Sequence, residues 1–275
     1  MSTSTLSLRA RLYWFLTKPG IIFGNILTTI AGFVLAAKGT FNPSLCIATL
    51  LGLSLVMASA CVFNNYIDCD LDKKMKRTKN RSLVTGDISK KSALTFGTSL
   101  GLLGAGCLFI FTNPLATLIA LVGLVVYVFL YSFAKYKTVH FTLIGSVAGA
   151  IPPVVGYCAV SNALDLCALL LFAILVLWQM PHFFAIAIYR LEDYAAGSIP
   201  VLPNKKGIFH TKVQMLFYTI AFVGISLVPF ILGYVGDVYL MTACILGSTW
   251  LWICVKGFTC SNDHRWARQV FSFPS

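Results

Sequence analysis

The chain has 275 residues, of which 58% are hydrophobic and only 11% are charged. Soluble domains have about 25% charged residues, so this composition excludes a soluble globular protein and indicates one that crosses a membrane several times. The net charge of +12 does not indicate nucleic-acid binding, because the basic residues lie between apolar segments, where they border a membrane. Nucleic acid is therefore not an expected partner.

The apolar segments predict an all-α protein, a polytopic transmembrane helical bundle with about eight spans. A bilayer span needs about 20 apolar residues, and helices satisfy their own backbone hydrogen bonds in lipid. No segment alternates apolar and polar residues over about ten positions, which argues against a transmembrane barrel. We expect residues 1–275 to form one integral membrane domain. The predicted spans are 20–38, 43–66, 93–112, 115–134, 140–160, 164–189, 213–235 and 238–257.

Basic residues alternate between the two sides of these spans. Of the 21 Lys and Arg residues, only Lys38 lies in a connection that follows the first, third, fifth or seventh span. This is the positive-inside pattern, so the other connections and both termini are predicted to be cytoplasmic. Two cytoplasmic termini agree with an even number of spans.

The second span ends in the stretch NNYIDCDLDKKMKRTKNRSL, residues 64–83, which contains three acidic and six basic residues. Asn64, Asp68 and Asp72 recur every four residues, so on a helix they lie within an arc of roughly 80°. One interpretation is a solvated helix end whose acids offset the lysines. The other is a Mg²⁺ site, since Mg²⁺ prefers oxygen ligands and typically uses one or two carboxylates plus substrate phosphates. Three oxygen ligands on one face favour the metal site, and Asp70 points elsewhere.

Basic residues that could bind a diphosphate follow this motif directly. Arg77, Lys79 and Arg81 come within nine residues of Asp72, and an Arg guanidinium suits bidentate contact with phosphate. Further along the chain, Pro152 and Pro153 are predicted to break the fifth span.

The sixth span contains an ionisable residue, His182, in the segment LWQMPHFF. A histidine in an apolar span is either a hydrogen-bonded packing residue or part of a functional site. Trp178 and the neighbouring phenylalanines offer flat apolar surface that could hold a porphyrin or an isoprenoid chain, with His182 as a candidate iron ligand. His210 and His264 are expected to lie in loops.

A second acidic cluster follows the sixth span in YRLEDYAAGSIPVLPNKKG, residues 189–207. Its Glu192 and Asp193 are either partners in a local ion pair or metal ligands, with Arg190 beside them as a candidate diphosphate ligand. Both acidic clusters follow the second of a pair of spans, and the two lie four spans apart. This symmetry predicts two pseudo-repeated four-helix halves, with Asp193 as the metal ligand of the second half.

At this point the chain resembles a known family. FNNYIDCDLDKKMKRTKNRSLVTG is similar to the NxxxDxxxD region of intramembrane prenyltransferases of the UbiA type. Further segments resemble the branch of this family that farnesylates haem. These segments are TKPGIIFGN at 17–25, CVFNNYID at 61–68, LIGSVAGAIPPVVGYCAV at 143–160 and LWQMPHFFAIAIYRLEDYAAGSIPVLP at 177–203.

The resemblance implies a reaction: farnesyl diphosphate and haem B, with water, give haem O and diphosphate, for haem A biosynthesis and terminal oxidases. It implies that Asn64, Asp68 and Asp72 hold Mg²⁺–diphosphate with help from Asp193. The residues implied to bind diphosphate directly are Arg77, Arg81 and Lys135. Where the family has an arginine after this lysine, the chain has Tyr136. The family normally has nine spans, so the ninth is expected to be absent here.

Other functions remain open at this stage. The acceptor could be a quinone precursor or another aromatic compound, or the protein could bind haem without catalysis. A cation-coupled transporter would place its acids near the bilayer midplane, whereas here they lie at span ends. The expected partners are haem B, farnesyl diphosphate, the lipid bilayer and the assembly of haem A synthase or a terminal oxidase. The expected location is the bacterial inner membrane.

Overall fold

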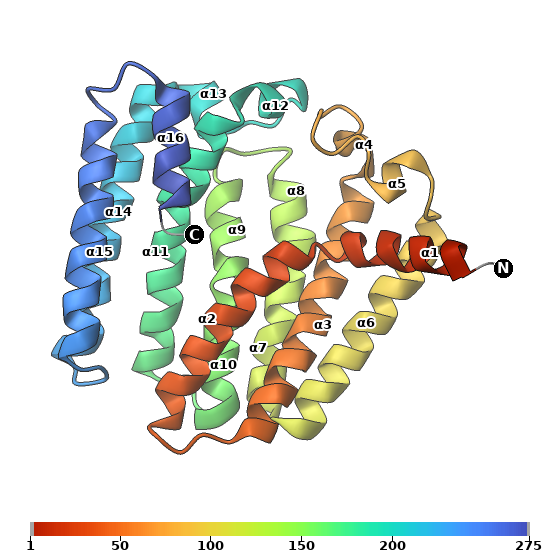
Figure 1. Ribbon diagram of the computed structural model, residues 1–275, viewed down its shortest axis with the longest axis horizontal. Coiled ribbons are helices and arrows are strands. Elements are labelled where there is room, and N and C mark those ends of the chain that lie inside the picture. Colours follow the sequence, from red (N-terminus) through yellow and green to blue (C-terminus); the bar gives the residue numbers. More distant parts are fainter. Residues whose placement is uncertain (1–2, 274–275) are drawn as a thin grey trace. The chain divides into compact units, whose positions relative to one another are not determined.

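The computed structural model describes residues 3–273, which form helices and no β-strand. Eight helices within this range are long and apolar enough to cross a membrane, which confirms the all-α prediction (Figure 1). Six of these spans are single continuous helices, and one of the six is α14 in the second half of the chain. The other five are α2 (Pro19–Ala37), α3 (Pro43–Ile67), α6 (Lys90–Phe111), α11 (Leu166–Tyr189) and α15 (Asp237–Lys256).

The fourth and fifth spans are each built from consecutive pieces. The fourth is α7 (Pro114–Val125), a π-helical turn η1 (Val126–Tyr131) and α8 (Ser132–Ala134), and the fifth is α9 (Phe141–Gly149) followed by α10 (Ile151–Ser161). Shorter helices lie outside the spans. They are α1 (Thr3–Leu16), α4 (Cys69–Asp72), α5 (Ser82–Thr85), α12 (Leu191–Ala196), α13 (Leu202–Lys206) and α16 (Asp263–Ser272).

Polar side chains cap the starts of four spans. Each accepts a hydrogen bond from the backbone N–H three residues ahead, which satisfies one of the donors left free at a helix start. The capping residues are Asn42, Ser89, Asn113 and Asp165. Pro43 and Pro114 follow two of these caps, in the first helical turn, where the missing N–H of proline costs nothing.

The chain groups into two compact units. The first consists of the residues up to Ser132 together with Ile151–Leu164, and the second of Phe133–Ala150 together with the residues from Asp165 onward. One of the boundaries between the units therefore falls inside the fifth span, after Ala150 and directly before Ile151 and the proline pair. The predicted break at Pro152 and Pro153 occurs here, and it assigns α10 to the first unit and α9 to the second.

Close helix packing organises the first unit. Helices α3 and α6 pack along their length, with the Ser59 hydroxyl donating to the Gly97 carbonyl at 2.7 Å. Helix α10 packs on α2, where a Cβ on Gly32 or Gly156 would collide with the carbonyl groups of Pro153 and Thr29. Small residues thus let backbones approach closely, as in other membrane helix pairs.

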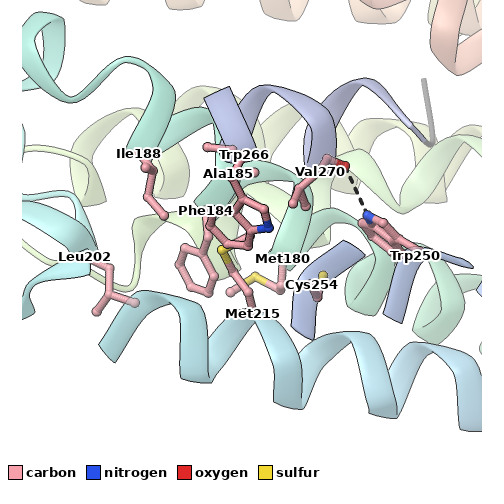
Figure 2. Close-up of a cluster of buried hydrophobic side chains, with 11 residues drawn as sticks. Met180, Phe184, Ala185, Ile188, Leu202, Met215, Trp250, Cys254, Trp266 and Val270 are labelled. Carbon is pink, nitrogen blue, oxygen red and sulfur yellow. Dashed lines mark hydrogen bonds between the residues drawn. The ribbon is translucent and has the colours of Figure 1, made fainter. Parts of the chain in front are cut away.

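The second unit has a core formed by α11, α15, α16 and the seventh span, α14 (Ile208–Ile231). Figure 2 shows its buried side chains, including Trp250, whose indole N–H donates to the Val270 carbonyl at 3.0 Å. The Trp266 indole N–H donates to the Ile253 carbonyl at 2.8 Å. These two bonds hold α16 against α15.

The seventh span was predicted at 213–235, but α14 starts five residues earlier and ends four residues earlier. The first turns of α14 contain polar residues, so a hydropathy argument places the start of the span after them. Lys212 is buried because its Nζ donates to the Gly257 carbonyl at 2.6 Å and to Asp263 Oδ1 at 2.5 Å. The early end follows from Gly233, whose φ of 73° provides a left-handed helix terminus.

The close approach of α10 to α2 gives a first prediction. Gly156→Ala places a methyl group against the Thr29 carbonyl, so it should lower the thermal unfolding midpoint in detergent, with an overpacking cost of about 1–3 kcal/mol. Gly24→Ala on α2 is the matched control. A Cβ there meets no atom within 4 Å, and the midpoint should stay level or rise. Equal destabilisation by both substitutions would contradict this packing.

Candidate functional site

The motif at the end of the second span keeps helical spacing although α3 ends at Ile67. The N–H of Asp68 donates to the Asn64 carbonyl at 2.9 Å, and the N–H of Asp72 donates to the Asp68 carbonyl at 2.8 Å. The backbone therefore continues through α4 with the same four-residue repeat. Asn64, Asp68 and Asp72 are consequently displayed one turn apart.

These three side chains are buried, in contrast to the acid between them. Asn64, Asp68 and Asp72 are 2%, 4% and 2% exposed. Asp70 lies on the surface, where its carboxylate accepts a hydrogen bond from Lys73 at 2.9 Å. That hydrogen bond and the lysine charge lower the pKa of Asp70. The structure thus separates a buried row of oxygen ligands from an ordinary surface ion pair.

The Asn64 side chain makes polar contacts with three other residues of the first unit. Its Oδ1 accepts a hydrogen bond from Lys18 Nζ at 2.5 Å and lies 3.5 Å from the Tyr127 hydroxyl. Its Nδ2 donates to Ser132 Oγ at 3.0 Å. Residues from the start of α2 and from the fourth span therefore fix the orientation of the Asn64 amide.

The π-helical turn η1 and Ser132, the residue directly after it, supply two of these contacts. A π-turn widens the helix by one residue and often occurs at functional sites. Here the Ser132 hydroxyl donates to the Tyr127 carbonyl, five residues earlier, at 3.1 Å. The Tyr127 and Tyr131 rings stack with centroids 5.2 Å apart. The turn brings both Tyr127 and Ser132 to Asn64.

Asp72 is held by the basic loop that follows it. Arg81 Nη1 donates to Asp72 Oδ2 at 2.6 Å and to Asn65 Oδ1 at 3.0 Å. Asn65 in turn donates to the Leu16 carbonyl at the end of α1. The Thr78 hydroxyl donates to the Asp72 carbonyl, so the loop folds back over the end of α3.

The other predicted basic residues have different environments. Arg77 and Lys79 are exposed on the loop between α4 and α5. Lys135 belongs to the second unit, where its side chain is buried and its Nζ lies 5.5 Å from the centre of the Tyr136 ring. Arg81 makes a hydrogen bond to the buried row, through the carboxylate of Asp72.

Four residues of this site were missed from the sequence: Lys18, Asn65, Tyr127 and Ser132. Lys18 had a usable signal, because it is a lone cation between a helix and the proline that starts the first span. Its φ of 55° is a left-handed conformation, which is unfavourable for a residue with a side chain. The contact between Lys18 and Asn64 offsets that strain.

The second acidic cluster lies at the start of α12 in the second unit. Arg190 Nη1 is 4.0 Å from Asp193 Oδ2, a loose ion pair, and both side chains are partly exposed. Glu192 is exposed. Both carboxylates fall in the first helical turn, where the helix dipole favours negative charge.

His182 lies on α11, which continues through Pro181. Its ring stacks on Trp178 at 5.1 Å and 19°, and its Nδ1 is buried without a hydrogen-bond partner. An unsatisfied buried nitrogen is uncommon, because leaving a donor or acceptor unpaired in an apolar environment costs free energy. His182 is therefore a buried imidazole with one ring nitrogen left without a hydrogen bond.

The donor set of the first unit suits Mg²⁺. Asp68 and Asp72 offer carboxylate oxygens and Asn64 an amide oxygen, all hard ligands. Such sites typically complete the coordination shell with phosphates and water. No group of three His, Cys, Asp or Glu side chains within residues 3–273 forms a ready-made metal centre.

Comparisons with known proteins identify close relatives. Residues 25–273 match the UbiA prenyltransferase family. The protoheme IX farnesyltransferase of Protochlamydia amoebophila is 54% identical over 261 residues, which covers 95% of this chain and 92% of the relative. The enzyme of the same name from Sodalis glossinidius is 53% identical, covering 95% of this chain and 89% of the relative.

Solved structures share the fold at lower identity. A UbiA homologue from Archaeoglobus fulgidus, bound to GPP and Mg²⁺, superposes with a TM-score of 0.72 at 14% identity, covering 95% of this chain and 97% of that one. An apo UbiA homologue from Aeropyrum pernix gives 0.71 at 19% identity, covering 93% and 94%. At these identities the likeness establishes the fold alone.

The Arg81–Asp72 pair gives a second prediction. Arg81→Met leaves a buried carboxylate without its cation, so it should reduce the free energy of unfolding by roughly 2–3 kcal/mol. Lys73→Met is the control, because it breaks the exposed pair with Asp70 and should change stability by less than about 1 kcal/mol. Denaturant titration of both variants measures the difference. If both lose equal stability, the Arg81–Asp72 contact is not a buried ion pair.

Proposed function

The chain belongs to the UbiA prenyltransferase family, and from this premise we propose that it farnesylates haem. The proposed reaction joins the farnesyl group of farnesyl diphosphate to the 2-vinyl group of haem B, with water, and releases haem O and diphosphate. The observation that carries it is identity above 50% to relatives named protoheme IX farnesyltransferase, over 95% of this chain. The buried row of Asn64, Asp68 and Asp72 supports it.

In this proposal the buried row holds the diphosphate through Mg²⁺. Asn64, Asp68 and Asp72 are the proposed ligands in the first unit, and Asp193 is a proposed further ligand. The ion would neutralise charge on the departing diphosphate, as metal ions do in phosphate chemistry. Lys18 and Arg81 keep the ligand side chains oriented before substrate arrives.

Cationic side chains complete the leaving-group site. We assign direct diphosphate contacts to Arg77, Lys79, Arg81 and Lys135, and Arg190 is a further candidate. Cleavage of an allylic carbon–oxygen bond moves an electron pair onto the diphosphate, so positive groups fixed nearby lower the barrier. A site between apolar helices also keeps bulk water away from the farnesyl cation.

The acceptor completes the balance of atoms. The terminal carbon of the haem vinyl group forms a bond to C1 of the farnesyl cation, and the new cation beside the porphyrin takes a water molecule. That water loses one proton, which leaves the hydroxyethylfarnesyl group of haem O. This route needs no nucleophilic side chain.

His182 and Trp178 are the proposed haem-contacting residues. The unpartnered Nδ1 of His182 can bind iron, and the Trp178 ring offers an apolar face. A quinone precursor or other aromatic acceptor has no use for an imidazole in this position. A non-catalytic haem-binding protein would use the histidine but not Asp68.

The proposed location of the protein in the cell is based on the distribution of Lys and Arg and on the bacterial origin of its relatives. The protein spans the membrane several times. The distribution of Lys and Arg supports cytoplasmic termini and cytoplasmic site loops, and the bacterial relatives support placement in the inner membrane. Haem A synthase or the terminal oxidase assembly is the proposed consumer of the product.

The metal–diphosphate assignment gives a third prediction. Asp68→Ala should reduce haem O formation by purified protein at least 100-fold, because one of two buried carboxylates of the proposed site is lost. Asp70→Ala, on the exposed side of the same turn, should keep near-normal turnover. Thermal unfolding of both variants checks that each is folded. Normal turnover by a folded Asp68→Ala variant would contradict the proposed metal site.

The haem assignment gives a fourth prediction. His182→Ala should weaken haem B binding at least tenfold and shift the haem absorption band, because the proposed iron ligand is lost. The control is His210→Ala on α14, whose ring contacts Gln214. An unchanged spectrum and affinity for His182→Ala would show that this histidine only packs against Trp178.

A further inference from the structure

One face of α11 carries an aromatic row in the second unit. Trp178, His182 and Tyr189 are spaced by four and seven residues, so they fall within about 40° of one another around the helix. His182 and Tyr189 are two turns apart, roughly 10 Å along the axis. Phe271 of α16 lies between them, with its ring centre 6.2 Å from His182 and 5.3 Å from Tyr189.

The inner end of this row is apolar around one nitrogen. The His182 ring stacks on Trp178 and meets Phe271 edge to face, at 87°. The Nδ1 atom of His182 is buried and has no hydrogen-bond partner. This end therefore consists of aromatic rings around one nitrogen that has no hydrogen-bond partner.

The outer end of the row is polar and carries the positive charge of Arg190. The Arg190 guanidinium lies 5.7 Å from the centre of the Tyr189 ring, and the His264 ring lies 4.3 Å from it at 32°. The Arg190 side chain is 39% exposed, and its Nη1 is 4.0 Å from Asp193 Oδ2, which makes a loose ion pair. Arg190 can therefore turn to another carboxylate at low cost.

We propose that Arg190 and His264 bind the propionate carboxylates of the haem acceptor, and this rests on the proposed function. Haem is a flat apolar ring with iron at its centre and two carboxylates on one edge. The row from His182 to Tyr189 has the same order: an unpartnered ring nitrogen, aromatic surface, and then a guanidinium with an imidazole beside it. An arginine fork pairs well with a carboxylate, and an imidazole N–H can donate a second hydrogen bond.

This inference gives Arg190 a different partner from the diphosphate suggested by the sequence. The ring contacts connect Arg190 to His182 through Tyr189 and Phe271, all inside the second unit. Arg190 directly follows Tyr189, which lies roughly 10 Å along the helix axis from His182. This separation suits the edge of the haem that bears the carboxylates. Arg190 is then a specificity-determining residue that selects a porphyrin bearing free carboxylates.

The test compares haem B with its dimethyl ester, in which both carboxylates are blocked. Absorbance titration gives the dissociation constant of each porphyrin for the unmodified protein, Arg190→Ala and the control Arg268→Ala, an exposed residue of α16. The unmodified protein and Arg268→Ala should prefer haem B about tenfold, as expected for one charge-assisted hydrogen bond. Arg190→Ala should lose that preference and bind the ester as before.

Steady-state kinetics separates the two assignments of Arg190. We expect Arg190→Ala to raise KM for haem B about tenfold and to leave KM for farnesyl diphosphate unchanged. A raised KM for farnesyl diphosphate with an intact preference for haem B would overturn the inference and return Arg190 to the diphosphate. Equal binding of haem B and its ester by the unmodified protein would also overturn it.

The same data distinguish failure of the proposed function. If the unmodified protein prefers haem B through Arg190 but forms no haem O, the carboxylate site stands and farnesyl transfer is wrong. If haem O forms without any Arg190-dependent preference, farnesyl transfer stands and the carboxylate site is wrong. His264→Ala should reduce the preference in the same direction as Arg190→Ala.

Discussion

Burying two carboxylates and an amide at the end of a membrane helix is the constraint on which the first unit depends. Carboxylates in a low-dielectric environment require compensating partners, since removing them from water costs several kcal/mol each. Arg81 meets this need for Asp72, and Lys18 bonds to the neighbouring Asn64. Two features of the local backbone place Arg81 and Lys18 next to these side chains. The loop after α4 folds back to bring Arg81, and the backbone at Lys18 takes a left-handed conformation.

The same arrangement explains how positive charge can serve two purposes. Basic residues at the ends of the spans set the orientation in the membrane. Arg81 also fixes Asp72, whereas the exposed Lys73 only pairs with Asp70. A carboxylate held by a cation is fixed in orientation, which is what binding a metal–diphosphate would require. One cluster of charges thus contains both surface residues suited to setting the topology and residues of the proposed metal site, and burial distinguishes the two groups.

Sequence was sufficient for the elements whose signal is local. Hydropathy predicted eight spans, and Pro152 with Pro153 predicted the break in the fifth. The start of the seventh span was missed because Lys212 is buried only through Gly257 and Asp263, some 45 to 51 residues away. His210 and His264 were expected in loops and instead lie in α14 and α16, since polar helix ends look like loops to a hydropathy argument.

The sequence predicted the row of candidate metal ligands, but it did not predict the residues that hydrogen-bond to them. The four-residue repeat identified Asn64, Asp68 and Asp72, whereas the contacts of Asn64 with Lys18 and Ser132 join residues 46 and 68 positions apart. No local pattern encodes such pairs, and the π-helical turn that presents Tyr127 has no sequence signal of its own.

The most direct test of farnesyl transfer to haem uses the purified protein with farnesyl diphosphate and Mg²⁺. Haem B and an aromatic acid are offered as competing acceptors, and the products are identified by mass. The account predicts haem O as the product, with its formation lost when a chelator removes Mg²⁺. A prenylated aromatic acid without haem O would contradict it.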